Sequence, residues 1–326
     1  MEPPGITRRG LLGTAAGAAT AAVLGAPAIA AAGSQPVPRP NVTPSGRTRE
    51  YWIAAVNTTW DLAPNGRDVV MDQPVPPESH RFPATIFRRF TPGWRRPWPN
   101  RRSGENAGIP GPTIRAQVGD EILVHFKNLD NLNRFPHSMH FHAFQYGPGS
   151  DGAFIPFRSG KGAEVPVGGT FTYRLFAGRD SHGVWPYHDH SHHMHESIGA
   201  GMYGSIVIAE PGERPPDREF VVFFANHGGL DTINGKAFIG NTPTFRARVG
   251  DIVQWDVLTI GDDFHVFHVH GHRWLRGGTP VDSELLGPSS TLRVRWREDA
   301  PGTWYYHCHV ESHMRNGMVG LYRVDR

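Results

Sequence analysis

The chain reads Gly302-Thr303-Trp304-Tyr305-Tyr306-His307-Cys308-His309, and Cys308 is the only cysteine among its 326 residues. In a β-strand, successive side chains point to opposite faces, so Cys308 would face one side while His307 and His309 face the other. His313 and Met318 follow the cysteine at five-residue steps. A thiolate, two imidazoles and a distant thioether form the ligand set of blue copper sites. This segment therefore predicts a blue copper site on one face of a strand and a second metal site on the other.

The second imidazole of the blue site must come from elsewhere, and we expect His265, which begins a second histidine-rich segment. Four His-x-His pairs occur in the chain: His140/His142, His188/His190, His268/His270 and His307/His309. Each pair would project two imidazoles from one face of a strand, about 6 to 7 Å apart. Chance could produce one pair among 19 histidines, but four pairs, one of them around the only cysteine, favour metal binding. Eight convergent imidazoles suit a cluster of three copper ions.

With these motifs, the sequence resembles the multicopper oxidases, specifically the small two-domain laccases of bacteria, over about residues 49–326. The resemblance implies four copper ions per chain. It assigns Cys308, His265, His313 and axial Met318 to the type 1 copper, and His140 and His268 to the type 2 copper. It assigns the other six histidines to the type 3 pair, with His142, His188 and His309 on one ion and His190, His270 and His307 on the other.

An internal repeat supports two domains of one kind. Residues 112–120 recur as 243–251, 137–142 as 265–270, 183–190 as 302–309, and 201–202 as 317–318. Abundant glycine and proline, without sustained helical periodicity, favour short strands joined by turns. We therefore predict an all-β chain of two cupredoxin-like Greek-key β-sandwich domains, at residues 49–210 and 218–326, joined by a linker at 211–217.

The two copies differ at one informative position, because Asp189 stands where the second copy has Cys308. Without the thiolate, the first domain cannot hold a blue site, although His137 and Met202 match His265 and Met318. We interpret His137 and Met202 as residues left over from duplication, with an extra labile metal site as the alternative. The nearby histidines are interpreted as solvated loop residues, or else as groups that deliver copper: His192, His193 and His195.

The family resemblance implies that electrons pass from the type 1 copper through Cys308 to His307 or His309, and that the cluster reduces dioxygen to water. Water formation needs protons, which copper-bound imidazoles cannot deliver. Asp151 and Asp282 match acidic positions near the cluster in small laccases, and each could instead be a turn residue. Tyr146 matches a tyrosine beside the cluster that could lend an electron; core packing is its alternative.

Three functions agree with these features. The first is a laccase-like oxidase of phenols and aromatic amines, and the second is an oxidase of metal ions such as Cu(I) or Mn(II). The third is a copper-binding protein without turnover, which would not need a thiolate strand flanked by eight histidines. Copper nitrite reductase needs fewer histidines at its second site, so the four His-x-His pairs argue against it. The short linker and the family resemblance also imply a homotrimer whose copper cluster lies between chains.

The N-terminal segment predicts export. Thr7-Arg8-Arg9-Gly10-Leu11-Leu12, followed by an Ala/Gly-rich stretch, is typical of a twin-arginine signal peptide, here residues 1–32, and residues 33–48 would form a linker. We expect a secreted protein without a membrane span. The formal net charge of +3 gives no reason to expect nucleic acid binding. Residues 88–102 hold six arginines among aromatic residues. We interpret them as an insertion that packs its aromatic side chains on the first domain, with binding of nucleic acid or an anionic polymer by charge and stacking as the alternative.

Overall fold

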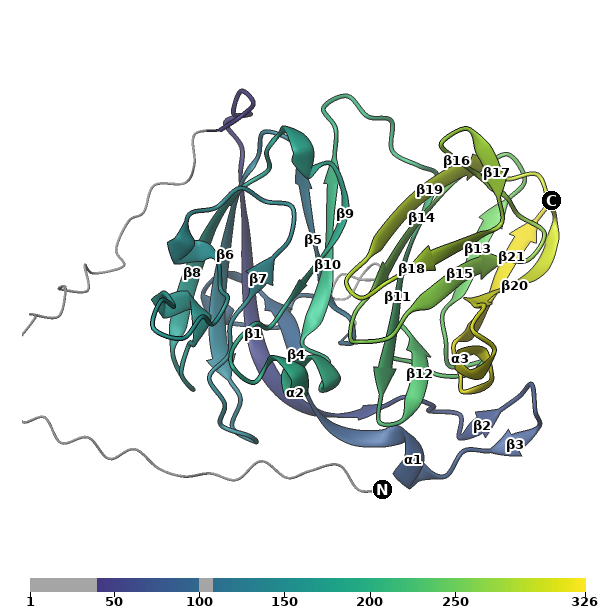
Figure 1. Cartoon of the computed structure of the whole chain (residues 1–326), viewed down its shortest axis with the longest axis horizontal. Helices are drawn as coiled ribbons and strands as arrows, with labels where there is room; N and C mark the ends of the chain where they lie inside the picture. The colour runs from purple at the N-terminus through teal and green to yellow at the C-terminus, as the bar shows by residue number, and fades with distance from the viewer. Residues whose placement is uncertain (1–39, 100–107) are drawn as a thin grey trace, which may run out of the picture. The chain divides into compact units, whose positions relative to one another are not determined.

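The computed structural model describes residues 40–99 and 108–326, and these residues form two β-sandwiches (Figure 1). The predicted signal segment lies outside the described residues. In the first sandwich, the two sheets have the strand orders β4-β1-β6-β8 and β5-β10-β9-β7. Their bounds are β1 Thr48–Asp61, β4 Arg81–Phe90, β5 Gly111–Gln117, β6 Glu121–Leu129, β7 His140–Phe141, β8 Thr170–Phe176, β9 Gly183–His188 and β10 Tyr203–Ala209.

The second sandwich repeats this plan, with the strand orders β12-β11-β14-β19 and β13-β21-β20-β15-β18. Its strands are β11 Arg218–His227, β12 Leu230–Ile233, β13 Thr244–Arg248, β14 Ile252–Thr259, β15 His265–Val269, β18 Ser283–Leu286, β19 Thr291–Arg297, β20 Gly302–Cys308 and β21 Val319–Asp325. In each copy the first long strand pairs in parallel with the third strand of its sheet, β1 with β6 and β11 with β14. The predicted fold of two cupredoxin-like Greek-key β-sandwiches is confirmed.

The remaining elements are short and lie in the connections. Two small hairpins pair β2 Arg67–Asp68 with β3 Gln73–Pro74, and β16 Trp274–Arg276 with β17 Thr279–Val281. The helices are α1 Pro77–His80, α2 Met194–Gly199 and α3 Glu311–Arg315, with 3₁₀ turns η1 Pro92–Trp94, η2 Pro148–Ser150, η3 Lys161–Ala163 and η4 Arg179–Ser181. Within residues 40–99 and 108–326, no helix has the length and apolar character needed to cross a membrane.

Alternating apolar residues build the core of each sandwich. Along β6, Ile122, Val124 and Phe126 are fully buried, while the residues between them are partly exposed. Each such side chain removed from water contributes about 1.5–3 kcal/mol to folding. Trp255 on β14 occupies the corresponding core of the second sandwich. The period of two is what a strand with one buried face requires.

A tyrosine–glycine pair fixes the strand that carries the histidines in both copies. The hydroxyl of Tyr187 donates to the carbonyl oxygen of Pro112, and that of Tyr306 to the carbonyl oxygen of Pro243, each at 2.7 Å. A Cβ at Gly204 would lie 2.4 Å from the Tyr187 ring, and a Cβ at Gly320 would lie 2.5 Å from the Tyr306 ring. Only glycine therefore lets the neighbouring strand approach these rings.

A third apolar cluster joins the two sandwiches of one chain. It includes Ile86 and Tyr203 from the first sandwich and Phe223 and Leu258 from the second. Within it, the Tyr203 hydroxyl lies 2.8 Å from Nε2 of His227, and burial lowers the pKa of His227 to about 4. The neutral ring can therefore accept a hydrogen bond from the Tyr203 hydroxyl across the domain boundary.

Candidate metal centres

The predicted thiol site gathers at the end of β20. Cys308 is the last residue of β20, His265 begins β15, and His313 lies on α3. The Cys308 Sγ atom lies 3.7 Å from Nδ1 of His265 and 3.7 Å from Nδ1 of His313. A trigonal ion with bonds of about 2.0 Å to nitrogen and 2.3 Å to sulfur separates such ligand atoms by roughly 3.7 Å. Met318 is fully buried in the same core cluster as Cys308. The donor set therefore fits copper of the blue type.

The surroundings of this thiol favour a bound cation. Burial raises the pKa of Cys308, although the backbone N–H of Val266 donates to its Sγ atom at 3.3 Å and opposes the rise. A thiolate here consequently needs a positive ion close by. Burial, followed by the charge of His313, lowers the pKa of His265 to about 4. The ring is thus neutral at neutral pH, as a metal ligand must be.

The first sandwich holds one half of a histidine cluster. The ligand atoms of His140, His142 and His188 all lie within 4.8 Å of one another. The Nε2 atoms of His142 and His188 are 3.4 Å apart. The His190 ring lies 5.2 Å from that of His140 and 5.6 Å from that of His188, measured between ring centroids. All four predicted histidines of this domain are therefore brought together.

The second sandwich holds a matching half. The ligand atoms of His268, His270 and His307 lie within 4.8 Å of one another, and the Nε2 atoms of His270 and His307 are 3.1 Å apart. The His309 ring lies 5.3 Å from the rings of both His268 and His307. Nitrogen atoms this close repel unless a proton or a metal ion lies between them, so each half is built to receive a cation.

Backbone carbonyl groups set the tautomers of the clustered histidines in the same way in both halves. The Nδ1 atoms of His140 and His268 lie 2.8 and 2.7 Å from the carbonyl oxygens of Asp151 and Asp282. Those of His188 and His307 lie 2.8 and 2.9 Å from the carbonyl oxygens of the next residue. A carbonyl only accepts, so Nδ1 carries the proton and Nε2 keeps a lone pair for a metal. Burial lowers the pKa of His188 and His307 to about 4, which keeps both rings neutral.

The histidine pairs lie at strand ends rather than within strands. Strand β7 contains His140 but not His142, because the chain turns at Ala143 with a φ of +73°. His270 and His309 likewise come directly after β15 and β20, and His190 lies two residues after the end of β9. The predicted alternation therefore holds up to the strand end, and the second histidine of each pair lies in the loop that leaves the sheet.

The two halves do not meet within one chain. Each candidate group of three ligands among the described residues takes its histidines from one sandwich only. The first half lines a cavity of 680 Å³ together with residues of the second sandwich such as Asn226, Ile260 and Asp263, and the clustered histidines of the second sandwich are not among the lining residues. His270 and His309 of the second half are exposed. Each half therefore has room for further ligands.

The predicted proton-relay residues lie at equivalent places in the two halves. Besides its carbonyl contact, Asp151 places Oδ1 3.3 Å from Nδ1 of His140. Burial, and then Asp151, raises the pKa of Tyr146 to about 12, and the Tyr146 ring lies 6.2 Å from that of His140. Tyr146 also packs against the first core. The carboxylate of Asp282 accepts a hydrogen bond from the Ser283 hydroxyl at 3.1 Å. Sequence reasoning missed Ser283, whose hydroxyl lies 3.3 Å from Nδ1 of His268.

The other histidines of the first domain contact protein groups. His137 lies between Asp130 and Asp189, and sequence reasoning did not identify Asp130. His192 pairs with Glu164, and the His193 ring stacks on Phe135 at 3.8 Å. His195 is exposed, 3.9 Å from Asp262. Among the described residues, His137, His192, His193 and His195 belong to no candidate metal group.

The arginine-rich segment packs on β1 as far as it is described. The Arg89 guanidinium lies over the rings of Tyr51 and Trp98, at 4.6 and 4.0 Å. The Trp94 ring contacts Trp52, with centroids 4.6 Å apart, and its Nε1–H donates to the carbonyl oxygen of Ile53. These contacts agree with the interpretation of residues 88–99 as a packed insertion, while residues 100–102 lie outside the described part.

Known proteins resemble this chain in both sequence and fold. Two family models, each described as multicopper oxidase, match residues 99–213 and 214–326. Ferroxidase HEPHL1 of Homo sapiens is 27% identical over 85% of this chain, and the chain spans only 29% of that protein.

Among solved structures, a multicopper oxidase aligns with a TM-score of 0.65 and 23% identity, covering 89% of this chain and 94% of its own. Copper nitrite reductase from Nitrosomonas europaea aligns with a TM-score of 0.66 and 20% identity, covering 86% and 95%. At these identities the structural likeness establishes a shared fold.

Proposed function

Because this chain belongs to the multicopper oxidase family, we propose that it is a laccase-like oxidase. It oxidises phenols and aromatic amines by one electron at a time and couples this to the four-electron reduction of dioxygen to water. Bound copper, four ions per chain, supplies the redox chemistry, while the protein fixes geometry and access.

The proposal assigns each gathered group one task. His265, Cys308, His313 and Met318 hold the type 1 copper, which accepts electrons from the reductant. The eight clustered histidines hold the other three ions, with His140 and His268 on the type 2 copper and the remaining six on the type 3 pair. Four of these imidazoles donate from Nδ1 to a backbone carbonyl oxygen, which leaves Nε2 to face a metal ion and supports this assignment.

One observation carries the proposal: the segment 307–309 belongs to both centres. Cys308 contributes the buried thiol, and its own carbonyl oxygen accepts a hydrogen bond from Nδ1 of the cluster ligand His307. A short covalent and hydrogen-bonded route therefore joins the thiol to the histidine cluster. A protein that only stores copper has no use for such a route.

The cluster is proposed to form between chains of a homotrimer. Each half supplies four imidazoles, and the exposed His270 and His309 lack partners from the first half of the same chain. A head-to-tail contact that places domain 1 of one chain against domain 2 of the next would close into a ring. The ring would give every cluster eight histidines.

Asp151 and Asp282 are proposed to pass protons to reduced oxygen. The Asp151 carboxylate lies beside Nδ1 of His140, and a carboxylate can exchange protons that a metal-bound imidazole cannot. Tyr146, whose pKa burial raises to about 12, is proposed to lend an electron from beside the same histidine.

An aromatic reductant is favoured by the surface next to the thiol site. Phe264, which precedes His265, is 60% exposed, and Leu285 on the neighbouring strand β18 is 64% exposed. Exposed apolar side chains at the edge of a redox site suit a phenol better than a hydrated cation. Oxidation of metal ions is the second candidate, because HEPHL1 is named a ferroxidase.

Dioxygen uptake tests these assignments. Copper-loaded protein is expected to consume dioxygen with a methoxyphenol, and uptake with Cu(I) alone would favour the metal-ion oxidase. Uptake with neither reductant, in protein that shows the blue absorption band, would favour a copper-binding protein without turnover.

A further inference from the structure

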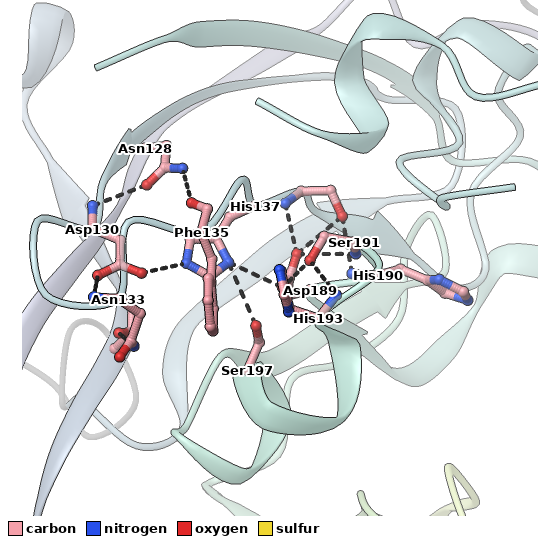
Figure 2. Close-up of polar contacts among 12 residues, drawn as sticks. Asn128, Asp130, Asn133, Phe135, His137, Asp189, His190, Ser191, His193 and Ser197 are labelled. Atoms are coloured by element: carbon pink, nitrogen blue, oxygen red, sulfur yellow. Dashed lines mark hydrogen bonds and ion pairs between the residues drawn. The ribbon is translucent and has the colours of Figure 1, made fainter. Parts of the chain in front are cut away.

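The first sandwich contains a counterpart of the thiol site in which His137 and Asp189 make polar contacts with protein groups (Figure 2). By the repeat, His137 corresponds to His265, Asp189 to Cys308 and Met202 to Met318. The backbone identifies the fourth counterpart. The N–H of Met202 donates to the carbonyl oxygen of Ser197 at 2.9 Å, just as that of Met318 donates to the carbonyl oxygen of His313 at 3.0 Å. Ser197 therefore stands where His313 stands in the second sandwich.

Two carboxylates enclose the imidazole of His137. Its Nδ1 atom lies 3.1 Å from Oδ2 of Asp189, and its Nε2 atom lies 3.0 Å from Oδ2 of Asp130. All three side chains are at most 1% exposed. Carboxylate oxygens only accept, so both ring nitrogens carry protons and the ring is a cation. A buried cation thus occupies the place where the second sandwich would hold a metal ion.

Other donors keep both carboxylates ionised. Asp130 accepts from the Asn57 side chain at 2.7 Å and from the N–H of Asn133 at 3.0 Å. Asp189 accepts from the N–H of Ser138 at 2.6 Å and from the Ser191 hydroxyl at 2.9 Å. Burial acts to raise the pKa of the Asp130 carboxyl, but Asn57, His137 and Asn133 outweigh it and hold that pKa below the usual value. The carboxylates in turn raise the pKa of His137 against the effect of burial.

The network reaches the cluster histidines through Ser138. Its hydroxyl donates to Oδ1 of Asp189 at 3.1 Å and accepts from the N–H of His190 at 2.9 Å. Ser138 lies two residues before His140, whereas Asp189 lies between His188 and His190. The contacts therefore tie the segment that bears His140 to the segment that bears the other two histidines. The strands alone give little support, because β7 has only two residues.

The second sandwich makes the matching connection with sulfur. There the N–H of Val266 donates to Sγ of Cys308, as that of Ser138 donates to Asp189. The N–H of His309 donates to the carbonyl oxygen of Val266 at 2.7 Å, where His190 uses the Ser138 hydroxyl instead. The connection in the second sandwich uses the thiol that is expected to bind a metal ion. The connection in the first sandwich uses a carboxylate and a hydroxyl, which need no metal ion.

We propose that the Asp130–His137–Asp189 triad occupies the position in the first domain that the type 1 copper takes in the second. Through Ser138, the triad positions His140, His188 and His190 for cluster copper. The inference rests on the proposed function, because it takes these histidines as copper ligands. It makes Asp189 and Ser138 positioning residues, which act on copper only through the histidines. The first half of the cluster would accordingly be ordered before any copper binds.

Asp189→Asn and Ser138→Ala test the proposal in the copper-loaded full chain. Both variants are expected to hold cluster copper about 10- to 100-fold more weakly, the usual loss when a group that orients a metal ligand is removed. The blue band should persist in both, since the thiol site lies in the other domain. Copper retained during titration with a chelator, and the electron paramagnetic resonance signal of the type 2 copper, provide readouts that do not depend on activity.

Met202→Leu serves as the matched control, because it changes the same pocket at nearly constant volume and removes no polar contact. It should keep all copper. If Asp189→Asn fails to fold, Ser138→Ala decides, since it leaves the three charges in place. Folded variants that hold cluster copper as tightly as the unaltered protein overturn this inference alone. Unaltered protein that shows a blue band but no cluster copper overturns the proposed function, and with it this inference.

Discussion

The Nδ1 atom of His307 donates a hydrogen bond to the carbonyl oxygen of Cys308 at 2.9 Å, and the first domain repeats this contact between His188 and Asp189 at 2.8 Å. The contact is therefore independent of the thiol. It orients a cluster histidine in both domains, and in the second domain the residue whose carbonyl accepts, Cys308, also presents a sulfur ligand. The thiol site and the histidine cluster can therefore be tested by separate substitutions.

Replacing Cys308 by Ser is expected to abolish the blue absorption band and oxidase turnover, because a hydroxyl cannot supply the soft thiolate. The clustered histidines keep their carbonyl contacts, so cluster copper should remain. The visible spectrum and copper analysis of the purified variant check both parts. A C308S protein that stays blue would contradict the type 1 assignment.

Mixing two inactive variants tests the inter-chain cluster. A His188→Ala chain and a His307→Ala chain are each expected to lack turnover alone. Refolded together with copper, they should regain part of it, because an intact domain 1 can meet an intact domain 2 of another chain. Each variant refolded by itself is the control. Mixed trimers that form but stay inactive would rule out the shared site.

Asp151→Asn is expected to keep all copper and the blue band, because the backbone carbonyl that accepts from His140 is unchanged. If the carboxylate relays protons, reoxidation of the reduced protein by dioxygen should slow by about a hundredfold or more. Stopped-flow recovery of the blue band measures this rate. Recovery at the unaltered rate would make Asp151 a turn residue.

Glu298 provides a test of stability against pH. This buried carboxylate is 3.0 Å from Nε2 of His272 and also accepts from Tyr322; burial acts to raise its pKa, but these contacts lower it from 4.5 to about 2. A lowered native pKa stabilises the fold above about pH 4.5, and the contribution is lost as the pH falls to about 2.

Glu298→Gln should therefore lower the free energy of unfolding by about 3 kcal/mol at pH 7, from 1.36 kcal/mol for each pKa unit. The difference between the two proteins should shrink at pH 3. Urea unfolding of copper-free protein at both pH values provides the measurement, and an equal difference at the two would contradict the linkage.

Export by the twin-arginine route predicts that Arg8→Lys combined with Arg9→Lys traps the precursor in the cytoplasm. Cell fractionation, followed by detection of the uncleaved chain, measures the outcome. Normal export of the double variant would point to another route.

The candidate ligand positions could be predicted from the sequence because they lie in short repeated motifs. Residues 183–190 and 302–309 end equivalent strands, so strand alternation places His307 and Cys308 on opposite faces. The gathering of His265, Cys308 and His313 follows that prediction. Asp130 could not be found in this way, because its role depends on a loop that brings it beside His137, seven residues along the chain.

The separation of the two histidine halves was expected from the family resemblance, but no motif of the chain predicts it. It follows from the way that the two sandwiches dock, through Tyr203, His227 and the apolar cluster around them. No local pattern encodes that docking, because its residues come from strands far apart in the chain. Ser283 is similar, since its hydroxyl reaches His268 only across the β15–β18 pair.

Dilution that dissociates the proposed trimer should separate the two halves of the histidine cluster. A chain that leaves the proposed trimer keeps its complete thiol site, yet it carries only half of the ligands for oxygen chemistry in each domain. Such a chain would still take up one electron from a phenol, but it could not pass that electron to dioxygen. The blue protein would therefore turn colourless. Turnover should therefore fall more steeply than the first power of protein concentration, and the solution would bleach under excess reductant even with air present.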